Sequence, residues 1–148
     1  MSTTTERAGN GFFDRLLAGE IARIVLIGLV VGILGGMGTF VYSRPAVSPY
    51  GDSVLGLVFL ALAGGYTHLL ARTMWESVRA MVVGFVVGMA TTILAWVLPL
   101  WLVPIHPSVR DLLIMSYLQQ AVATVVMAYL LVYFAGYFVV VSLDGLLG

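Results

Sequence analysis

Few side chains in this sequence have the chemistry to catalyse a reaction or to ligate a metal. Cysteine is absent, which excludes disulfide bonds, thiolate metal ligands and thiol catalysis. The only imidazoles are those of His68 and His106. The topology derived below places them at opposite faces of a membrane, so they cannot share a metal ion or a haem iron within one chain. His68 could ligate a haem or a metal that another subunit completes, but an interfacial histidine hydrogen-bonded to a neighbouring helix is the simpler interpretation.

A row of neutral polar side chains runs through the last apolar stretch. Ser116, Gln120 and Thr124 repeat every four residues, so they share one face of a helix. In a membrane, such groups must find hydrogen-bond partners, because lipid provides none. They could line a transport path, but hydrogen bonding to a neighbouring helix is the interpretation that we favour.

A row of tyrosines continues the same stretch. Tyr129, Tyr133 and Tyr137 are also spaced four apart. Tyrosines at this spacing are typical of helix packing and of the aromatic belt at a membrane surface. A flat aromatic stripe could instead receive a quinone head, a carotenoid or a lipid tail. We predict no cofactor, and haem, quinone and carotenoid remain open as ligands.

A charged cluster lies between the second and third apolar stretches. His68 ends the second stretch, and Arg72, Glu76 and Arg79 follow at spacings of four and three. A helix through these residues would set one carboxylate between two guanidiniums. We therefore expect an electrically neutralised corner at the membrane surface, not an active site.

Signatures of known catalytic machinery are absent from the sequence. It contains no Gly-x-Ser-x-Gly motif, no His-Glu-x-x-His motif and no phosphate-binding glycine loop. The expected topology also brings no serine, histidine and acid together on one membrane face. We therefore expect no catalytic residue, no metal site and no enzyme that acts alone.

The elements that position these residues follow from the distribution of charge. Only 9% of residues are charged, against about 25% in soluble domains. Four windows carry no charge at all, namely residues 24–43, 53–71, 80–109 and 112–143. Because about 20 apolar residues cross the hydrocarbon layer as a helix, each window can supply one span. The spans are expected at about 22–43, 54–73, 80–102 and 112–141, within one transmembrane domain at 22–143.

The chain ends differ from the spans. Residues 1–9 are small and polar, which predicts a disordered tail. Residues 10–21 place Phe12, Leu16 and Ile21 at helical spacing, which predicts an amphipathic helix in the headgroup layer or a docking surface for a partner. Residues 144–148 form a short tail. The expected fold is an all-α integral membrane protein, a four-helix bundle preceded by this interfacial helix.

Glycines mark the expected packing faces. Gly28, Gly32 and Gly36 stack at intervals of four in the first span, and Gly84 and Gly88 do so in the third. Such glycines flatten a helix face, so that a second backbone can approach closely. The pattern does not say whether that second helix belongs to the same chain.

Arginine placement predicts the orientation. Five arginines lie at the N-terminal arm and the second connection, against Arg44 and Arg110 on the other side. The excess places both termini in the cytoplasm, and we expect the plasma membrane of a prokaryotic cell. The formal net charge of zero leaves no basic stripe for nucleic acid. All charged residues fall at expected helix ends or loops, so no buried carboxylate is available for proton-coupled export.

Three functions are compatible with this pattern. The first is a non-catalytic accessory or scaffold subunit of a larger membrane complex. The second is a homo-oligomeric transporter or channel for a neutral solute. The third is a binder of a lipid-soluble cofactor, based on the tyrosine row and His68. The expected partners are the lipid bilayer and other membrane chains or copies of the same chain.

Overall fold

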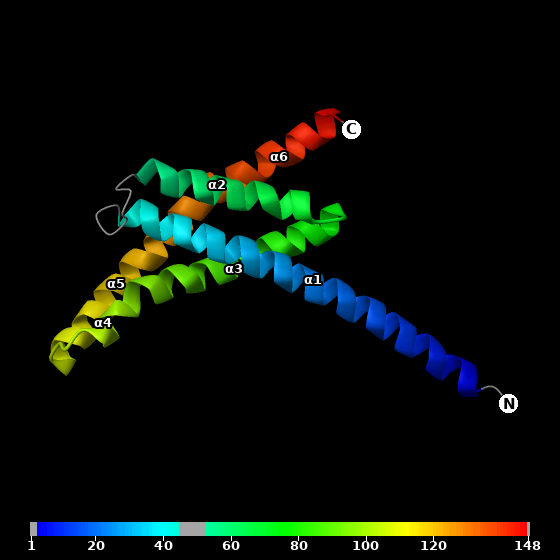
Figure 1. The fold of residues 1–148 in the computed structure, drawn as a ribbon, viewed down its shortest axis with the longest axis horizontal. Coiled ribbons are helices and arrows are strands. Elements are labelled where there is room, and N and C mark those ends of the chain that lie inside the picture. Colours follow the sequence, from blue (N-terminus) through cyan, green and yellow to red (C-terminus); the bar gives the residue numbers. More distant parts are fainter. Residues whose placement is uncertain (1–2, 45–52, 148) are drawn as a thin grey trace.

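The computed structural model describes the backbone of residues 3–44 and 53–147 and the side chains of residues 19–44 and 53–147. All regular structure in these ranges is helical. The elements are α1 (Thr3–Ser43), α2 (Ser53–Leu70), α3 (Met74–Val97), α4 (Pro99–Leu102), α5 (Pro107–Ala128), the π-helical turn η2 (Tyr129–Tyr133) and α6 (Phe134–Leu147). Figure 1 shows their arrangement.

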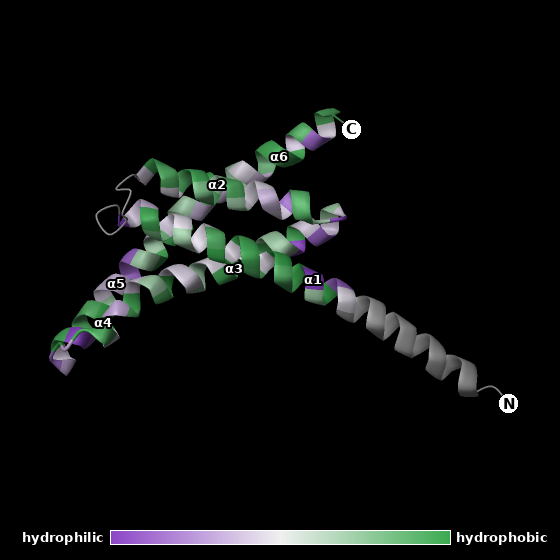
Figure 2. Cartoon of the chain, viewed as in Figure 1, coloured by the Kyte–Doolittle hydropathy of each residue, from purple (hydrophilic) through white to green (hydrophobic). Residues whose placement is uncertain are grey.

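Four helical stretches are long and apolar enough to cross a membrane, as the charge-free windows predict. They are Gly19–Ser43, Ser53–Leu70, Met74–Leu102 and Pro107–Leu147. Hydrophobic residues cover the helices along the bundle, whereas hydrophilic residues gather near its ends (Figure 2). The prediction of an all-helical fold with four helices long and apolar enough to span a membrane is confirmed.

The first and last helices are longer than the sequence predicts. α1 is continuous from Thr3, so residues 3–9 are helical where we expected a disordered tail, and no break separates residues 10–21 from the first span. No proline interrupts this arm. The apolar face of residues 10–18 lies outside the described side chains. α6 likewise continues to Leu147, through most of the segment predicted as a tail at 144–148.

Proline and threonine set the ends of the third and fourth spans. Thr73 caps α3 by accepting a hydrogen bond from the backbone N–H of Glu76, so this helix begins six residues before the predicted start at residue 80. Leu98 separates α3 from the short α4, which begins at Pro99. Pro107 is the first residue of α5, where its fixed φ and missing N–H suit a helix start.

The two ends of the bundle are chemically different. We call the end with residues 71–73 the turn end, and the end with residues 103–106, where α1 ends and α2 begins, the loop end. Glu20 of α1 contacts Arg79, and Asp144 of α6 contacts His68. Both chain ends therefore leave the bundle at the turn end, and α1 projects beyond it (Figure 1).

Glycines let α1 cross α3 at close range. A Cβ added to Gly32 would lie 2.8 Å from the carbonyl oxygen of Gly84, and one added to Gly36 would lie 2.8 Å from that of Gly88. Thr92 of α3 donates a hydrogen bond to the carbonyl of Gly36 at 3.2 Å. The helix that packs against the Gly28, Gly32 and Gly36 face is thus α3 of the same chain.

A second close crossing joins α2 to α6. A Cβ on Gly136 would collide with the carbonyl oxygen of Ala61, and one on Gly64 with that of Tyr133. Between the two crossings the centre is filled by fully buried Val31, Leu60, Tyr129 and Tyr133. Packing and not a polar cavity therefore occupies the middle of the described bundle.

The Tyr129 hydroxyl fits a notch made by two glycines. A Cβ on Gly35 would lie 2.6 Å from this oxygen, and one on Gly88 would collide with it. The oxygen is buried and has no hydrogen-bond partner among the described residues. The glycines at 35 and 88 thus make room for a polar atom that the fold leaves unpaired.

We expect Gly35→Ala to lower the free energy of unfolding by about 1 to 3 kcal/mol, because the added methyl overpacks this notch. Tyr129→Phe removes both the clash and an unsatisfied hydroxyl, so it should be neutral or stabilising. In the double variant the nearest remaining contact of the new Cβ is 3.3 Å, and stability should return to that of Tyr129→Phe. Unfolding in detergent micelles, followed by circular dichroism, measures all three.

Gly19→Ala is the matched control, since a Cβ there meets nothing within 4 Å and should not destabilise. Additive losses in the Gly35 and Tyr129 double variant would show that the hydroxyl does not occupy the notch.

Candidate functional site: the polar chains at the turn end

Glu76 caps the start of α3 and is buried there. Thr73 Oγ1 accepts from the Glu76 N–H at 3.2 Å, and Glu76 Oε2 accepts from the Arg72 N–H at 2.8 Å. This is a variant of the capping box, in which the glutamate reaches the residue before the cap. The sequence Thr73-Met74-Trp75-Glu76 carries its signature. A carboxylate in the first turn also interacts favourably with the helix dipole.

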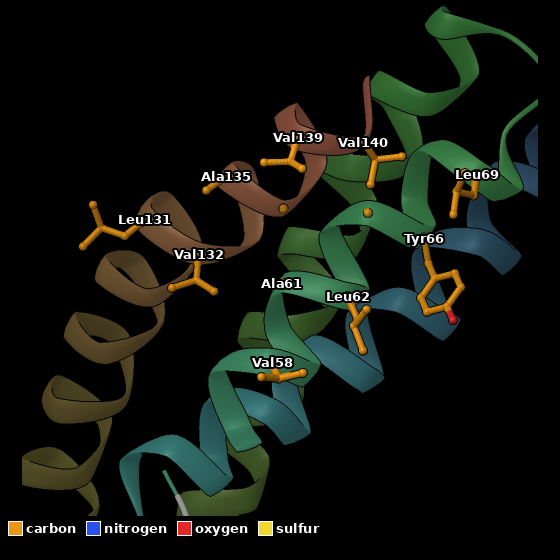
Figure 3. Close-up of a pocket in the computed structure, with 12 residues that line it drawn as sticks. Val58, Ala61, Leu62, Tyr66, Leu69, Leu131, Val132, Ala135, Val139 and Val140 are labelled. Carbon is orange, nitrogen blue, oxygen red and sulfur yellow. The ribbon is translucent and has the colours of Figure 1, made fainter. Parts of the chain in front are cut away.

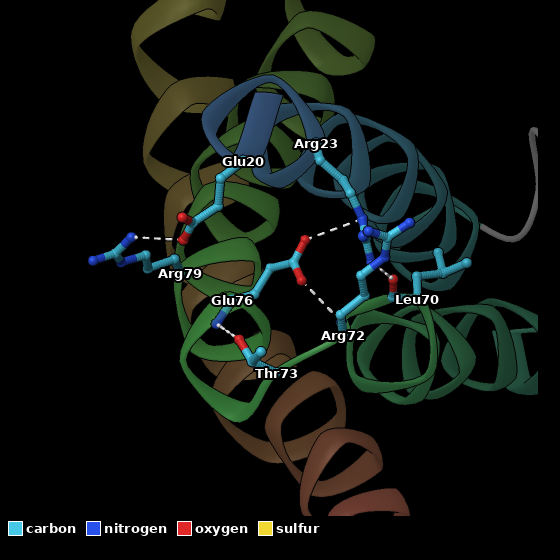
Figure 4. A network of polar contacts seen from close by, with 7 residues as sticks. All are labelled: Glu20, Arg23, Leu70, Arg72, Thr73, Glu76 and Arg79. Atoms are coloured by element: carbon cyan, nitrogen blue, oxygen red, sulfur yellow. Dashed lines mark hydrogen bonds and ion pairs between the residues drawn. The ribbon is translucent and has the colours of Figure 1, made fainter. Parts of the chain in front are cut away.

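The charges around Glu76 are paired differently from the spacing prediction (Figure 4). Its Oε1 lies 3.1 Å from Arg23 Nε of α1, and Arg23 also donates to the Leu70 carbonyl at 3.1 Å. Arg79 pairs with Glu20 at 3.3 Å. Glu76 therefore does not lie between the Arg72 and Arg79 guanidiniums. Arg72 precedes the helix, and α1 brings its own charges to this corner.

A second polar chain joins α2, α3 and α6. His68 Nε2 lies 3.2 Å from Asp144 Oδ2, and His68 Nδ1 lies 3.3 Å from Ser77 Oγ. Ser77 donates to the Tyr137 hydroxyl at 3.1 Å. The expectation that no serine, histidine and acid meet on one membrane face is therefore wrong. It placed Ser77 in a connecting turn and Asp144 in a tail, but both residues are helical.

The order acid, imidazole, hydroxyl is that of a serine hydrolase, but the geometry does not suit nucleophilic attack. Ser77 is 0% exposed, and its proton is directed to Tyr137 and not to the imidazole. Because Ser77 Oγ donates its proton to Tyr137, it can only accept in its contact with the His68 ring. The hydrogen-bonded series of Asp144, His68, Ser77 and Tyr137 therefore connects α2, α3 and α6.

The tyrosine row belongs to the core. Tyr129, Tyr133 and Tyr137 are at most 3% exposed, and the Tyr133 hydroxyl lies 3.0 Å from Thr67 Oγ1. The π turn at Tyr129–Tyr133 lies within this row. Because the rings pack between helices, they offer no open stripe on which a quinone or carotenoid could lie.

The polar row of α5 lies outside the bundle. Ser116 and Gln120 are exposed and Thr124 is half-buried, and no hydrogen bond joins their side chains to another described residue. Gln120 and Thr124 line a hollow of about 530 Å³ with Ser43, Ser53 and Trp96. Ser43 is the last residue of α1, Ser53 is the first residue of α2, and Trp96 is next to the last residue of α3. The polar row therefore lies at the loop end and not in a central path.

No metal centre is present in the part of the chain that the structure describes, where no three potential ligands come together. His106 Nδ1 lies 2.8 Å from Ser108 Oγ at the loop end, whereas His68 lies at the turn end. Sequence reasoning placed the two histidines apart in the same way. The sequence analysis did not predict the contact between His68 and Ser77. The tight turn between α2 and α3 could have indicated it, because it brings the end of one helix close to the start of the next.

Comparison of the chain with protein families, with curated proteins and with solved structures found no match. Any function must therefore be argued from the chain itself.

Removing the Arg23 side chain should leave the Glu76 carboxylate buried without its counter-charge. We expect Arg23→Gln to lower the free energy of unfolding by about 1 to 3 kcal/mol, and Glu76→Gln in the same chain to restore part of that loss. The matched control is Arg79→Gln, whose exposed ion pair with Glu20 is worth about 0 to 1 kcal/mol. Equal losses for the two arginine variants in denaturant titrations would contradict this assignment.

The burial of Ser77 predicts that it does not react as a nucleophile. A fluorophosphonate probe should leave the folded protein unlabelled, while a known serine hydrolase in the same detergent is labelled. Labelling that Ser77→Ala abolishes would instead make the chain of Asp144, His68 and Ser77 catalytic.

Proposed function

We propose that this protein is a non-catalytic subunit of the prokaryotic plasma membrane, with both termini in the cytoplasm, and that it packs against another membrane protein chain through the polar face of α5. The turn end, with its arginines, is then the cytoplasmic end. The N-terminal part of α1 is a second candidate contact with the membrane surface or with a partner.

The observation that carries this proposal is the state of Gln120. Its side-chain amide is exposed on a helical stretch apolar enough to span a membrane, without a hydrogen bond to any described residue. Other polar groups in the bundle, such as Thr67, Thr92 and Ser77, are bonded within the chain. A second chain that supplies donors and acceptors to this amide would stabilise it, as hydrogen bonds between membrane helices do.

The filled interior supports a subunit over a transporter that works as one chain. Val31, Leu60, Tyr129 and Tyr133 are 0 to 1% exposed at the centre. The hollows described on this chain open on its outside. If copies of the chain assembled around the hollow of Gln120 and Thr124, a polar path could form between them, and a transporter for a neutral solute is the alternative proposal.

Replacing Gln120 by leucine should weaken association with the partner. Measured hydrogen bonds between membrane helices predict a loss of roughly threefold to twentyfold in affinity. The matched control is Gln119→Leu, which changes the same residue type one position away, outside the hollow. Affinity purification in mild detergent, followed by native mass determination, measures the fraction that retains its partner.

Each outcome discriminates between the functions. A larger membrane protein in fixed ratio, lost from Gln120→Leu only, supports the subunit. A homo-oligomer whose solute flux in vesicles is abolished by Gln120→Leu supports the transporter instead. A folded monomer in both variants, under conditions that keep known complexes intact, would overturn the assigned interface.

A further inference from the structure

An apolar groove runs between α2 and α6 on the outer surface of the bundle (Figure 3). Its volume is about 590 Å³, within the range of small-molecule sites. Its centre is formed by Ala61, Gly65, Ala135 and Gly136, whose small size leaves the space open. Valine and leucine side chains and the ring of Tyr66 make its walls.

The length of the groove matches half a membrane. It extends along α2 from Val58 to Leu69, which is about 16 Å of helix rise. One leaflet of the hydrocarbon layer is about 15 Å deep. A partner helix that crosses the membrane would need twice that length, whereas the acyl chain of one lipid needs only one leaflet.

A polar pocket continues the groove at the turn end. Leu69 lines both, and the polar pocket of about 320 Å³ adds His68, Arg72, Thr73 and Asp144. An apolar groove that leads into a charged pocket at a membrane surface fits an amphiphile with its head attached to its tail. It does not fit a uniformly apolar ligand.

Arg72 and Asp144 both line the pocket, beside the imidazole of His68. The Arg72 guanidinium has no carboxylate within ion-pair distance among the described residues, whereas Arg23 and Arg79 are each paired. Asp144 uses Oδ2 for His68 and its side chain is 74% exposed, so Oδ1 faces no described partner. A phosphate accepts hydrogen bonds from a guanidinium, and a primary ammonium donates to a carboxylate.

We infer that this groove and pocket form a binding site for a zwitterionic phospholipid with a primary amine, of the phosphatidylethanolamine type. Its phosphate binds Arg72, its ammonium binds Asp144, and one acyl chain occupies the groove between α2 and α6. A quaternary choline head has no N–H to donate, and a glycerol head has no positive charge for Asp144, so both bind more weakly.

The test uses the delipidated full chain in detergent and native mass spectrometry. The probes share palmitoyl and oleoyl chains and carry ethanolamine, N-methylethanolamine, N,N-dimethylethanolamine, choline or glycerol heads. We expect the ethanolamine lipid to bind roughly threefold to tenfold more tightly than the choline lipid, with a stepwise loss on methylation. This series needs no substitution, so it does not depend on the folding of a variant.

Variants assign the two parts of the site. Ala135→Leu fills the groove and should weaken binding of every lipid, whereas Ala90→Leu, at an exposed alanine of α3, should not. Arg72→Gln should weaken all phospholipids, and Asp144→Asn should remove only the preference for ethanolamine over choline.

Several results would overturn the inference. These are equal binding of the ethanolamine and choline lipids, tighter binding of the glycerol lipid, or equal effects of Ala135→Leu and Ala90→Leu. If the protein is a dimer that Ala135→Leu dissociates, the groove is instead the contact surface for a second copy of the chain.

Discussion

Close approach of helix backbones is the constraint on which the rest of this structure depends. In lipid, apolar side chains gain little by moving from the bilayer to another helix, so association relies on van der Waals contact at short range. Gly32 and Gly36 provide it where α1 crosses α3, and Gly64 and Gly136 where α2 crosses α6. A methyl group at any of these positions would meet backbone atoms of the facing helix.

The buried tyrosines follow from those crossings. Glycines leave notches between the close backbones, and the hydroxyl oxygens of Tyr129 and Tyr133 enter these notches beside Gly88 and Gly84. The Tyr133 hydroxyl is hydrogen-bonded to Thr67, whereas the Tyr129 hydroxyl has no partner among the described residues. The centre of the described bundle is therefore filled by side chains, and one buried hydroxyl there is left unpaired.

The ion pairs gather at the turn end, whereas the polar row of α5 lies at the loop end. At the turn end, Glu76 and His68 connect α1, α2, α3 and α6 through bonds within the chain. Arg72 and Asp144 remain available to a lipid head there. At the loop end, the Gln120 side chain has no hydrogen-bond partner among the described residues. One end is thus suited to the lipid and the other to a second protein, which is compatible with a subunit held in a membrane assembly.

The sequence by itself determined four helices long and apolar enough to span a membrane, their approximate places and the absence of cysteine, because these depend on composition alone. The glycine spacing indicated close packing, but only the tertiary structure identified α3 as the partner of α1. Sequence also could not reveal that Tyr129, Tyr133 and Tyr137 are core, that Gln120 faces outward, or that Asp144, His68 and Ser77 meet. Helical spacing fixes which residues share a face, whereas the crossing of helices distant in the chain decides what that face meets.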